Sequence, residues 1–266
     1  MHDVRPAAVA GMFYPSAPDC LAGDIRAYLD DATPSRAKVP KALIVPHAGY
    51  VYSGPIAATA YALLAPVRDA VDRVVLLGPA HRVPVRGLAT TSAGYFATPL
   101  GEVPVDADAV GTALTFSQVA VSDAAHAGEH ALEVQLPFLQ TVLRRFTLVP
   151  LAVGHATLRE VEEVLDALWG GPETLVVVSS DLSHYHAYAE AKRIDRATAD
   201  AILAMSPTLD HEQACGATPL NGLLQCARRR DLSPALLDLR NSGDTAGDRS
   251  RVVGYASFAF AADGAG

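Results

Sequence analysis

Short, uninterrupted apolar runs punctuate this chain and constrain its fold more than any other feature. They are rich in leucine and β-branched residues, each is closed by proline, glycine or serine, and they cover residues 42–45, 73–77, 147–153 and 174–178. Runs of this kind predict strands, and their continuity predicts a sheet covered on both faces. Helical patterns lie between them at 55–64 and 158–169. The sequence therefore predicts an α/β fold with a central, mostly parallel sheet flanked by helices.

Two later segments refine this fold. Residues 251–260 alternate in character and predict a late strand, antiparallel to its neighbour, so that the sheet is mixed. Residues 129–145 carry leucines at helical spacing and predict a helix, which Pro137 either kinks or begins. Because no long polar linker or repeat divides the chain, we expect one domain over residues 1–266.

Composition narrows the classes of partner and the compartment. The chain has 21 basic and 29 acidic residues, a net charge of −8, which disfavours binding to nucleic acid. Its three cysteines are widely spaced and odd in number, which favours free thiols and a cytoplasmic location. No apolar run approaches the roughly 20 residues that span a bilayer, and the N-terminus lacks a signal-peptide pattern, so we expect no membrane partner.

Histidines follow three of the expected strands. His47 comes shortly after the first, His81 after the second and His184 after the fourth. Ligands of open α/β sheets gather at the carboxyl ends of the strands, so these imidazoles are expected to converge. Neutral imidazoles with a carboxylate suit ferrous iron, copper or zinc. Asp181 could be that carboxylate, or it could accept a hydrogen bond that fixes a histidine tautomer.

A second group of polar residues falls on the helix expected at 129–145 and just before it. His126, His130 and Glu133 are spaced at i, i+4 and i+7, which would place them on one helical face. His130 could act as an acid or base with Glu133 orienting it, or the group could be a solvated surface. Tyr50, with Tyr52 nearby, could stack on a ligand ring or cap the core.

Two hypotheses of nucleophilic catalysis remain open as alternatives to the metal site. Cys215 precedes an expected helix at 220–230, which could lower the pKa of its thiol. Ser179 and Ser180 lie close to Asp181 and His184 in the sequence, so a serine nucleophile is a further alternative, although turn hydrogen bonds are the favoured explanation of such a pair.

Several motifs together resemble the Memo family, whose microbial members are called AmmeMemoRadiSam system protein B. The resemblance extends from the N-terminal segment 5–15 to Tyr255-Ala256, and its motifs are Pro46-His47-Ala48-Gly49-Tyr50, Gly78-Pro79-Ala80-His81, Glu129-His130-Ala131-Leu132-Glu133, Ser179-Ser180-Asp181-Leu182-Ser183-His184 and Cys215-Gly216.

This resemblance implies a fold similar to the catalytic subunit of class III extradiol dioxygenases, which hold ferrous iron with two histidines and a carboxylate. It places His47 and His81 at the first two ligand positions. Animal members have a cysteine that can join the metal, and we match its position to residues 241–245 of this chain, where no cysteine occurs. The third ligand is therefore Asp181, His184, Asp244 or water.

Two functions follow. The first is a non-haem, dioxygenase-like oxidoreductase with Fe(II), or else copper or zinc. Its expected metal ligands are His47, His81 and His184, its catalytic residues His130 and Asp181, and its substrate-binding residues Tyr50 and Glu133. The alternative is a non-catalytic module that binds a peptide or protein and works with a radical SAM protein and an Amme-type protein, as the family name implies. A zinc hydrolase is a third, weaker reading.

Overall fold

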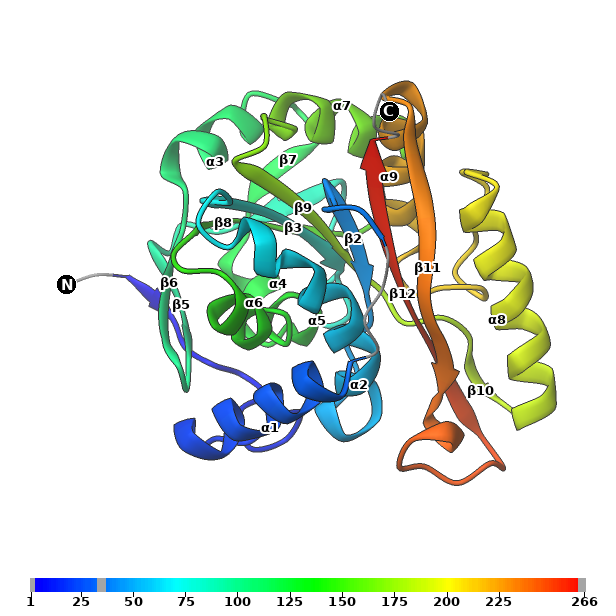
Figure 1. The fold of residues 1–266 in the computed structure, drawn as a ribbon. Helices are drawn as coiled ribbons and strands as arrows, with labels where there is room; N and C mark the ends of the chain where they lie inside the picture. The colour runs from blue at the N-terminus through cyan, green and yellow to red at the C-terminus, as the bar shows by residue number, and fades with distance from the viewer. Residues whose placement is uncertain (1–2, 33–36, 263–266) are drawn as a thin grey trace.

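The structure is a computed structural model that describes residues 3–32 and 37–262. Its main sheet (Figure 1) is built from β2 (Ala42–Val45), β3 (Arg73–Pro79), β4 (Leu88–Thr90), β7 (Val119–Val121), β8 (Thr147–Val153), β9 (Thr174–Ser179), β10 (His184–His186), β11 (Leu232–Asn241) and β12 (Val252–Ala262). The strands lie in the order β10-β12-β2-β9-β3-β8-β4-β7, and β11 pairs with β12. All four strands expected from the apolar runs are therefore present.

Strand directions make the sheet mixed. The four central strands, β2, β9, β3 and β8, are mutually parallel. On one side β12 runs antiparallel to β2, and on the other β4 runs antiparallel to β8. The predicted α/β class, the mixed sheet and the late antiparallel strand are thus confirmed, with the parallel pairing concentrated in the centre.

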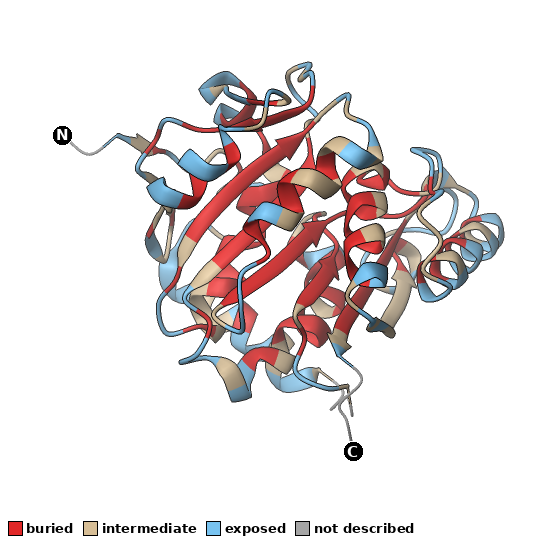
Figure 2. Cartoon of the chain, turned by 90° about the horizontal axis from the view of Figure 1, so that it is seen from above, coloured by how far each residue is buried: buried red, intermediate tan, exposed pale blue. Residues whose placement is uncertain are grey.

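Helices cover both faces of this sheet. One face is covered by α3 (Ala107–Ala113), α7 (Leu158–Leu168), α8 (Tyr188–Leu203) and α9 (Ala217–Arg229), and the other by α1 (Pro18–Asp31), α2 (Tyr50–Tyr61), η1 (Ala62–Val67), α5 (His130–Glu133) and α6 (Leu136–Val142). Figure 2 shows the strands buried between these layers.

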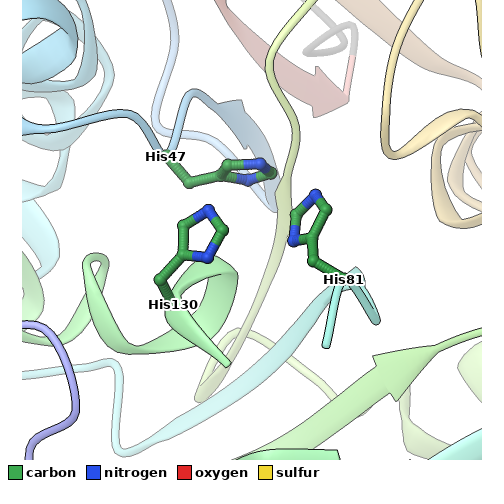
Figure 3. A group of neighbouring side chains, drawn as sticks. All are labelled: His47, His81 and His130. Atoms are coloured by element: carbon green, nitrogen blue, oxygen red, sulfur yellow. The ribbon is translucent and has the colours of Figure 1, made fainter. Parts of the chain in front are cut away.

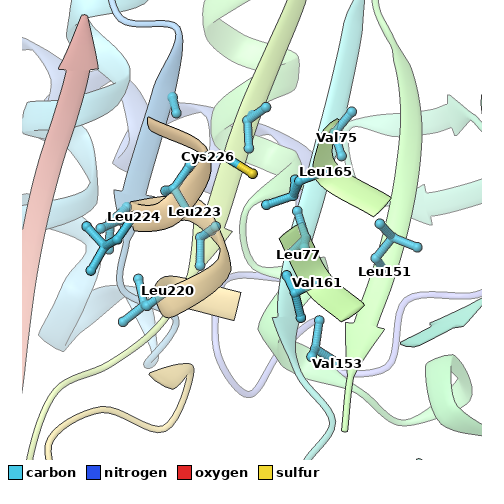
Figure 4. Close-up of a cluster of buried hydrophobic side chains, with 14 of the residues drawn as sticks. Val75, Leu77, Leu151, Val153, Val161, Leu165, Leu220, Leu223, Leu224 and Cys226 are labelled. Atoms are coloured by element: carbon cyan, nitrogen blue, oxygen red, sulfur yellow. The ribbon is translucent and has the colours of Figure 1, made fainter. Parts of the chain in front are cut away.

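Each central strand contributes side chains to two hydrophobic cores, because successive side chains point to opposite faces of the sheet. In β3, Val75 and Leu77 pack against α7 and α9, a cluster drawn in Figure 4. Val74 and Leu76 face the layer that contains α2 and α6. All four side chains are fully buried. This double burial explains why the strands read as continuous apolar runs rather than as alternating ones.

The single helix expected at 129–145 is wrong. The structure has two short helices instead, α5 and α6, preceded by α4 (Asp123–Ala127). Pro137 lies in the first turn of α6, where its missing N–H costs nothing, so it marks the start of a new helix rather than a kink. Proline also lies inside α2, which begins at Tyr50 and not at Pro55 as expected.

Some elements carry little signal in the sequence. A small second sheet forms from β1 (Val4–Arg5), β5 (Tyr95–Thr98) and β6 (Gly101–Pro104), each too short for a reliable pattern. Within residues 3–32 and 37–262, no helix is long and apolar enough to cross a membrane.

Candidate metal centre

Three histidines from distant parts of the chain meet at the carboxyl end of the central strands. His47 follows β2, His81 follows β3, and His130 begins α5. Each offers one ligand atom, and these atoms all lie within 4.8 Å of one another. The ring centroids are 5.2 Å apart for His47 and His81, 5.4 Å for His47 and His130, and 4.7 Å for His81 and His130. Figure 3 shows the three rings gathered around a common centre.

A glycine brings α5 close enough to contribute its histidine. A Cβ atom on Gly78 in β3 would lie 3.0 Å from Leu132 Cδ2 and 3.2 Å from Ala131 Cβ. Such distances are tighter than ordinary van der Waals contact, so a larger residue at this position would push α5 away. The glycine thus permits the close packing that carries His130 to the two strand-end histidines.

Glu129, the N-cap of α5, holds one of the histidines, His81. Its side chain accepts hydrogen bonds from the backbone N–H of His81 at 2.6 Å, from His81 Nδ1 at 2.9 Å and from the backbone of Ala131 at 2.9 Å. Burial raises the pKa of the Glu129 carboxyl, but these hydrogen bonds and the His81 charge outweigh it and bring the pKa to about 2. Glu129 is therefore a fixed anion directly behind the histidine cluster.

His47 is buried and held from two directions. Its backbone N–H donates to Asp181 Oδ1 at 2.7 Å, and its Nδ1 lies 2.9 Å from Ser179 Oγ. Burial, followed by the neighbouring His81, lowers the pKa of His47 to about 3. The ring is thus neutral at physiological pH, which is the form that binds a metal ion.

His130 supplies the test of whether the site suits a metal. Its Nδ1 is buried and makes no hydrogen bond to any described residue, with Glu129 Oε1 at 3.5 Å. Burial and the nearby His47 lower the pKa of His130 to about 4, and the Phe13 ring packs 4.7 Å from its ring. Three imidazoles, one of them with an unsatisfied buried nitrogen, form a donor set that fits a transition-metal ion.

Cys215 adds a thiol to this cluster. Its Sγ lies 3.3 Å from His47 Nε2. Burial, and then the charge of Asp181, raise the pKa of the Cys215 thiol to about 12, so the lowered pKa predicted from its place before α9 is wrong. A bound cation would reverse this shift, because a coordinating thiol loses its proton.

Asp181 and His184 lie at the edge of the cluster. Asp181 is buried and uses Oδ1 to accept from His47, and burial raises the pKa of its carboxyl. His184 begins β10 and is absent from the group of three imidazoles whose ligand atoms lie within 4.8 Å. The structure therefore places His130, and not His184, beside His47 and His81. The candidate ligand Asp244 lies apart, where it accepts a hydrogen bond from Tyr188.

A pocket of about 680 Å³ opens beside the cluster. His81 and Cys215 line it from the cluster side, and His155, His184 and His211 line it elsewhere. The cluster is thus held by buried hydrogen-bonding residues on one side and faces a ligand-sized pocket on the other.

The two residues expected to bind substrate make internal contacts instead of lining this pocket. The Tyr50 hydroxyl donates to Val134 O at 2.6 Å, and the side chain is 4% exposed. Glu133 is fully buried, pairs with Arg5 and accepts from Tyr14 Oη and from Ala8 N. These contacts correspond to the core-capping alternative for Tyr50. A substrate role for either residue stays a prediction.

The prediction that His126, His130 and Glu133 share one helical face is wrong, because the chain turns between α4 and α5. His126 lies on α4, is buried and contacts Ala89 O through Nε2. The side chain that orients His81 is Glu129. Its signal was its place before His130 at a helix start, since acidic side chains commonly cap helices there.

Known proteins match this chain over nearly its whole length. The family model described as Memo-like protein matches residues 5–259. A MEMO1 family protein of Aeropyrum pernix is 37% identical over 95% of this chain and 98% of its own length. Corresponding proteins of Archaeoglobus fulgidus and Ignicoccus hospitalis are 37% and 35% identical, each over 97% of this chain and 99% and 98% of their own lengths. The chain therefore belongs to the Memo family.

Proposed function

We propose that this Memo-family chain binds one transition-metal ion through His47, His81 and His130 and uses it for redox chemistry on a small molecule in the adjoining pocket. The observation that carries the proposal is the grouping of three imidazole ligand atoms within 4.8 Å. Isolated histidines on loops scatter, whereas these come from three separate elements and converge. Cys215, next to His47, is a fourth potential donor.

Fe(II) is the metal that the family resemblance implies, with copper or zinc as alternatives. Imidazole binds all three, and a thiolate from Cys215 would favour copper or zinc. A bound Fe(II) ion supplies one-electron and oxygen chemistry. The dioxygenase-like fold that the family resemblance implies supports this choice by analogy, because fold and reaction are loosely coupled.

The protein's own groups divide the remaining work. Glu129 stays ionised and offsets the positive charge of the ion, as its pKa of about 2 allows. His130 belongs to the ligand group, so we assign proton handling to Asp181, which lies beside His47, and to His184, which lines the pocket. The pocket accepts a small molecule next to His81 and Cys215.

Elemental analysis tests this function. Protein purified without added metal, then reconstituted anaerobically with Fe(II), is expected to hold about one ion per chain. His47→Ala and His81→Ala should each lose most of it, whereas His155→Ala, an exposed histidine of the same pocket, should keep it. Unchanged metal content in both cluster variants would reject the proposal. A panel of catechols, assayed with and without oxygen, then tests turnover.

A second candidate function is a peptide- or protein-binding module. Exposed apolar side chains favour it: Met12 is 72% exposed and Val51 58%. Met12 precedes Phe13 and Val51 follows Tyr50 in the sequence, and the Tyr50 N–H donates to the Phe13 carbonyl at 2.7 Å. The Phe13 ring in turn packs on His130 of the cluster. The partners we propose are a radical SAM protein and an Amme-type protein. Binding measured with each purified partner tests this, with Met12→Ser and Val51→Ser expected to weaken it.

The proposed compartment is the cytoplasm. The thiols of Cys20, Cys215 and Cys226 are all free in the structure, which suits a reducing environment. Fractionation of the native protein tests this location directly.

A further inference from the structure

The hydrogen bonds behind His47 determine which of its two ring nitrogens carries the proton. A neutral imidazole binds a metal only through the nitrogen that has no hydrogen, and its tautomer is set by the partner of the other nitrogen. For His47, the partner of Nδ1 is Ser179 Oγ at 2.9 Å. A hydroxyl can donate or accept, so this contact alone leaves the tautomer open.

The orientation of Gln135 removes part of that freedom. Its Nε2 lies 2.8 Å from the carbonyl oxygen of Pro46, an atom that can only accept. The amide nitrogen must therefore face Pro46, and Tyr61 Oη donates to the Gln135 oxygen at 2.8 Å. The same amide nitrogen lies 2.8 Å from Ser179 Oγ, so Gln135 donates to the serine.

A third contact settles where the serine hydrogen goes. Ser179 Oγ lies 2.7 Å from the backbone carbonyl of Ala131, which again can only accept. Ser179 has one hydrogen and two lone pairs, so donating to Ala131 leaves it to accept from Gln135 and from His47. If Ser179 donated to His47 instead, this carbonyl would lose that hydrogen bond. Ser179 and Gln135 are 0% and 1% exposed, so water does not readily replace a lost partner.

We propose that Gln135 and Ser179 are positioning residues that hold His47 in the Nδ1–H tautomer and thereby keep its Nε2 free to bind the metal ion. Nε2 is the nitrogen that lies 3.3 Å from Cys215 Sγ, on the side of the pocket. The use of this tautomer for metal binding rests on the proposed function. The tautomer itself is a property of the metal-free chain.

The hydrogen bonds that link Gln135, Ser179 and His47 lie where α5 ends and α6 begins. Gln135 is the residue immediately before α6, and Ala131 lies within α5. Val134 and Gln135 form the short junction between the two helices, and from there the Gln135 side chain reaches Ser179.

The experiment is a long-range proton–nitrogen correlation spectrum of the metal-free protein, kept in chelator, with His47 assigned by comparison with His47→Gln. The account predicts a protonated Nδ1 and an unprotonated Nε2 in the wild-type protein. A protonated Nε2 in the wild-type spectrum would overturn it, and this measurement needs no variant of Ser179 to fold.

Ser179→Ala extends the test. It should shift His47 away from the Nδ1–H tautomer and weaken Zn²⁺ binding by about 10–100-fold. Ser183→Ala is the matched control, because Ser183 is equally buried and its hydroxyl makes no hydrogen bond to the described residues. An unchanged tautomer in folded Ser179→Ala would contradict the inference. A wild-type protein with the predicted tautomer but no metal affinity would reject the proposed function alone.

Discussion

Glu129 accepts two hydrogen bonds from one residue, His81: the backbone N–H at 2.6 Å and the ring Nδ1 at 2.9 Å. The first fixes the chain that leaves β3, and the second fixes the ring. In a neutral ring, a carboxylate that accepts from Nδ1 leaves Nε2 without a hydrogen, so Nε2 is the nitrogen that His81 presents to a metal ion. This contact joins a helix start to a strand end and orders the site before any ion arrives.

Replacing this carboxylate should weaken metal binding without unfolding the chain. Glu129→Gln keeps the side-chain volume but removes the negative charge, and we expect metal affinity to fall about 10–100-fold. Calorimetric titration with Zn²⁺ measures it. Glu212→Gln is the control, since Glu212 lines the pocket but is exposed. Equal affinity in the two variants would show that Glu129 does not support the site.

Glu133 should matter for stability. Its buried carboxylate pairs with Arg5, and the backbone N–H groups of Ala8 and Val9 also donate to it. Glu133→Gln leaves the Arg5 charge buried without its partner, which typically costs about 3–5 kcal/mol of unfolding free energy. Urea denaturation measures this loss. Wild-type stability combined with weaker ligand binding would instead support the substrate role predicted from the sequence.

Close packing at Gly78 should be sensitive to a single methyl group. Gly78→Ala places a Cβ 3.0 Å from Leu132 and should displace α5, so we expect weaker metal binding and lower stability by about 1–3 kcal/mol. Gly111→Ala, in α3, is the control because no described atom lies within 4 Å of the added Cβ. The control should keep its metal affinity. A Gly78→Ala protein indistinguishable from it would contradict the role given to this glycine.

Stability of the metal-free protein should fall with pH below about 6.5. The pKa values of His47 and His130 are about 3 and 4 in the folded state, against the ordinary 6.5 in the unfolded chain. As the pH falls below 6.5, these histidines therefore bind protons in the unfolded state but not in the folded state. Each of them lowers the unfolding free energy by up to about 1.4 kcal/mol for every pH unit of decrease. Below about 4.5, Glu129 adds a further loss, because its folded pKa is about 2.

Urea denaturation at pH 7.5 and pH 5.0, with chelator present, measures this dependence. His47→Gln lacks one of the two groups and should show a shallower loss between these values. A wild-type protein equally stable at both pH values would contradict the pKa shifts assigned to burial.

A large part of this architecture could be predicted from the sequence, because parallel strands that are buried on both faces appear as continuous apolar runs. The sequence also predicted that His47 and His81 would meet, since β2 and β3 lie on either side of β9 and end at the same edge. The strand-end argument did not bring His184 into the group within 4.8 Å, because five residues, numbers 179–183, separate it from the apolar run that ends at Val178, and it lies in the pocket wall at β10.

His130 could not be recognised as the third histidine from spacing alone. Its position depends on the close approach of α5 to β3 that Gly78 permits. This approach is a tertiary effect that no local pattern encodes. The contact of Cys215 with His47 joins residues 168 positions apart, and the sequence offered only its place before a helix as a signal.

Anomalous diffraction from crystals soaked anaerobically with Fe(II), or with Zn²⁺, tests the central claim most directly. The account predicts one peak about 2.0–2.2 Å from a ring nitrogen of each of His47, His81 and His130. A peak held by His184 and Asp181 without His130, or no peak in crystals shown to contain the ion elsewhere, would contradict it.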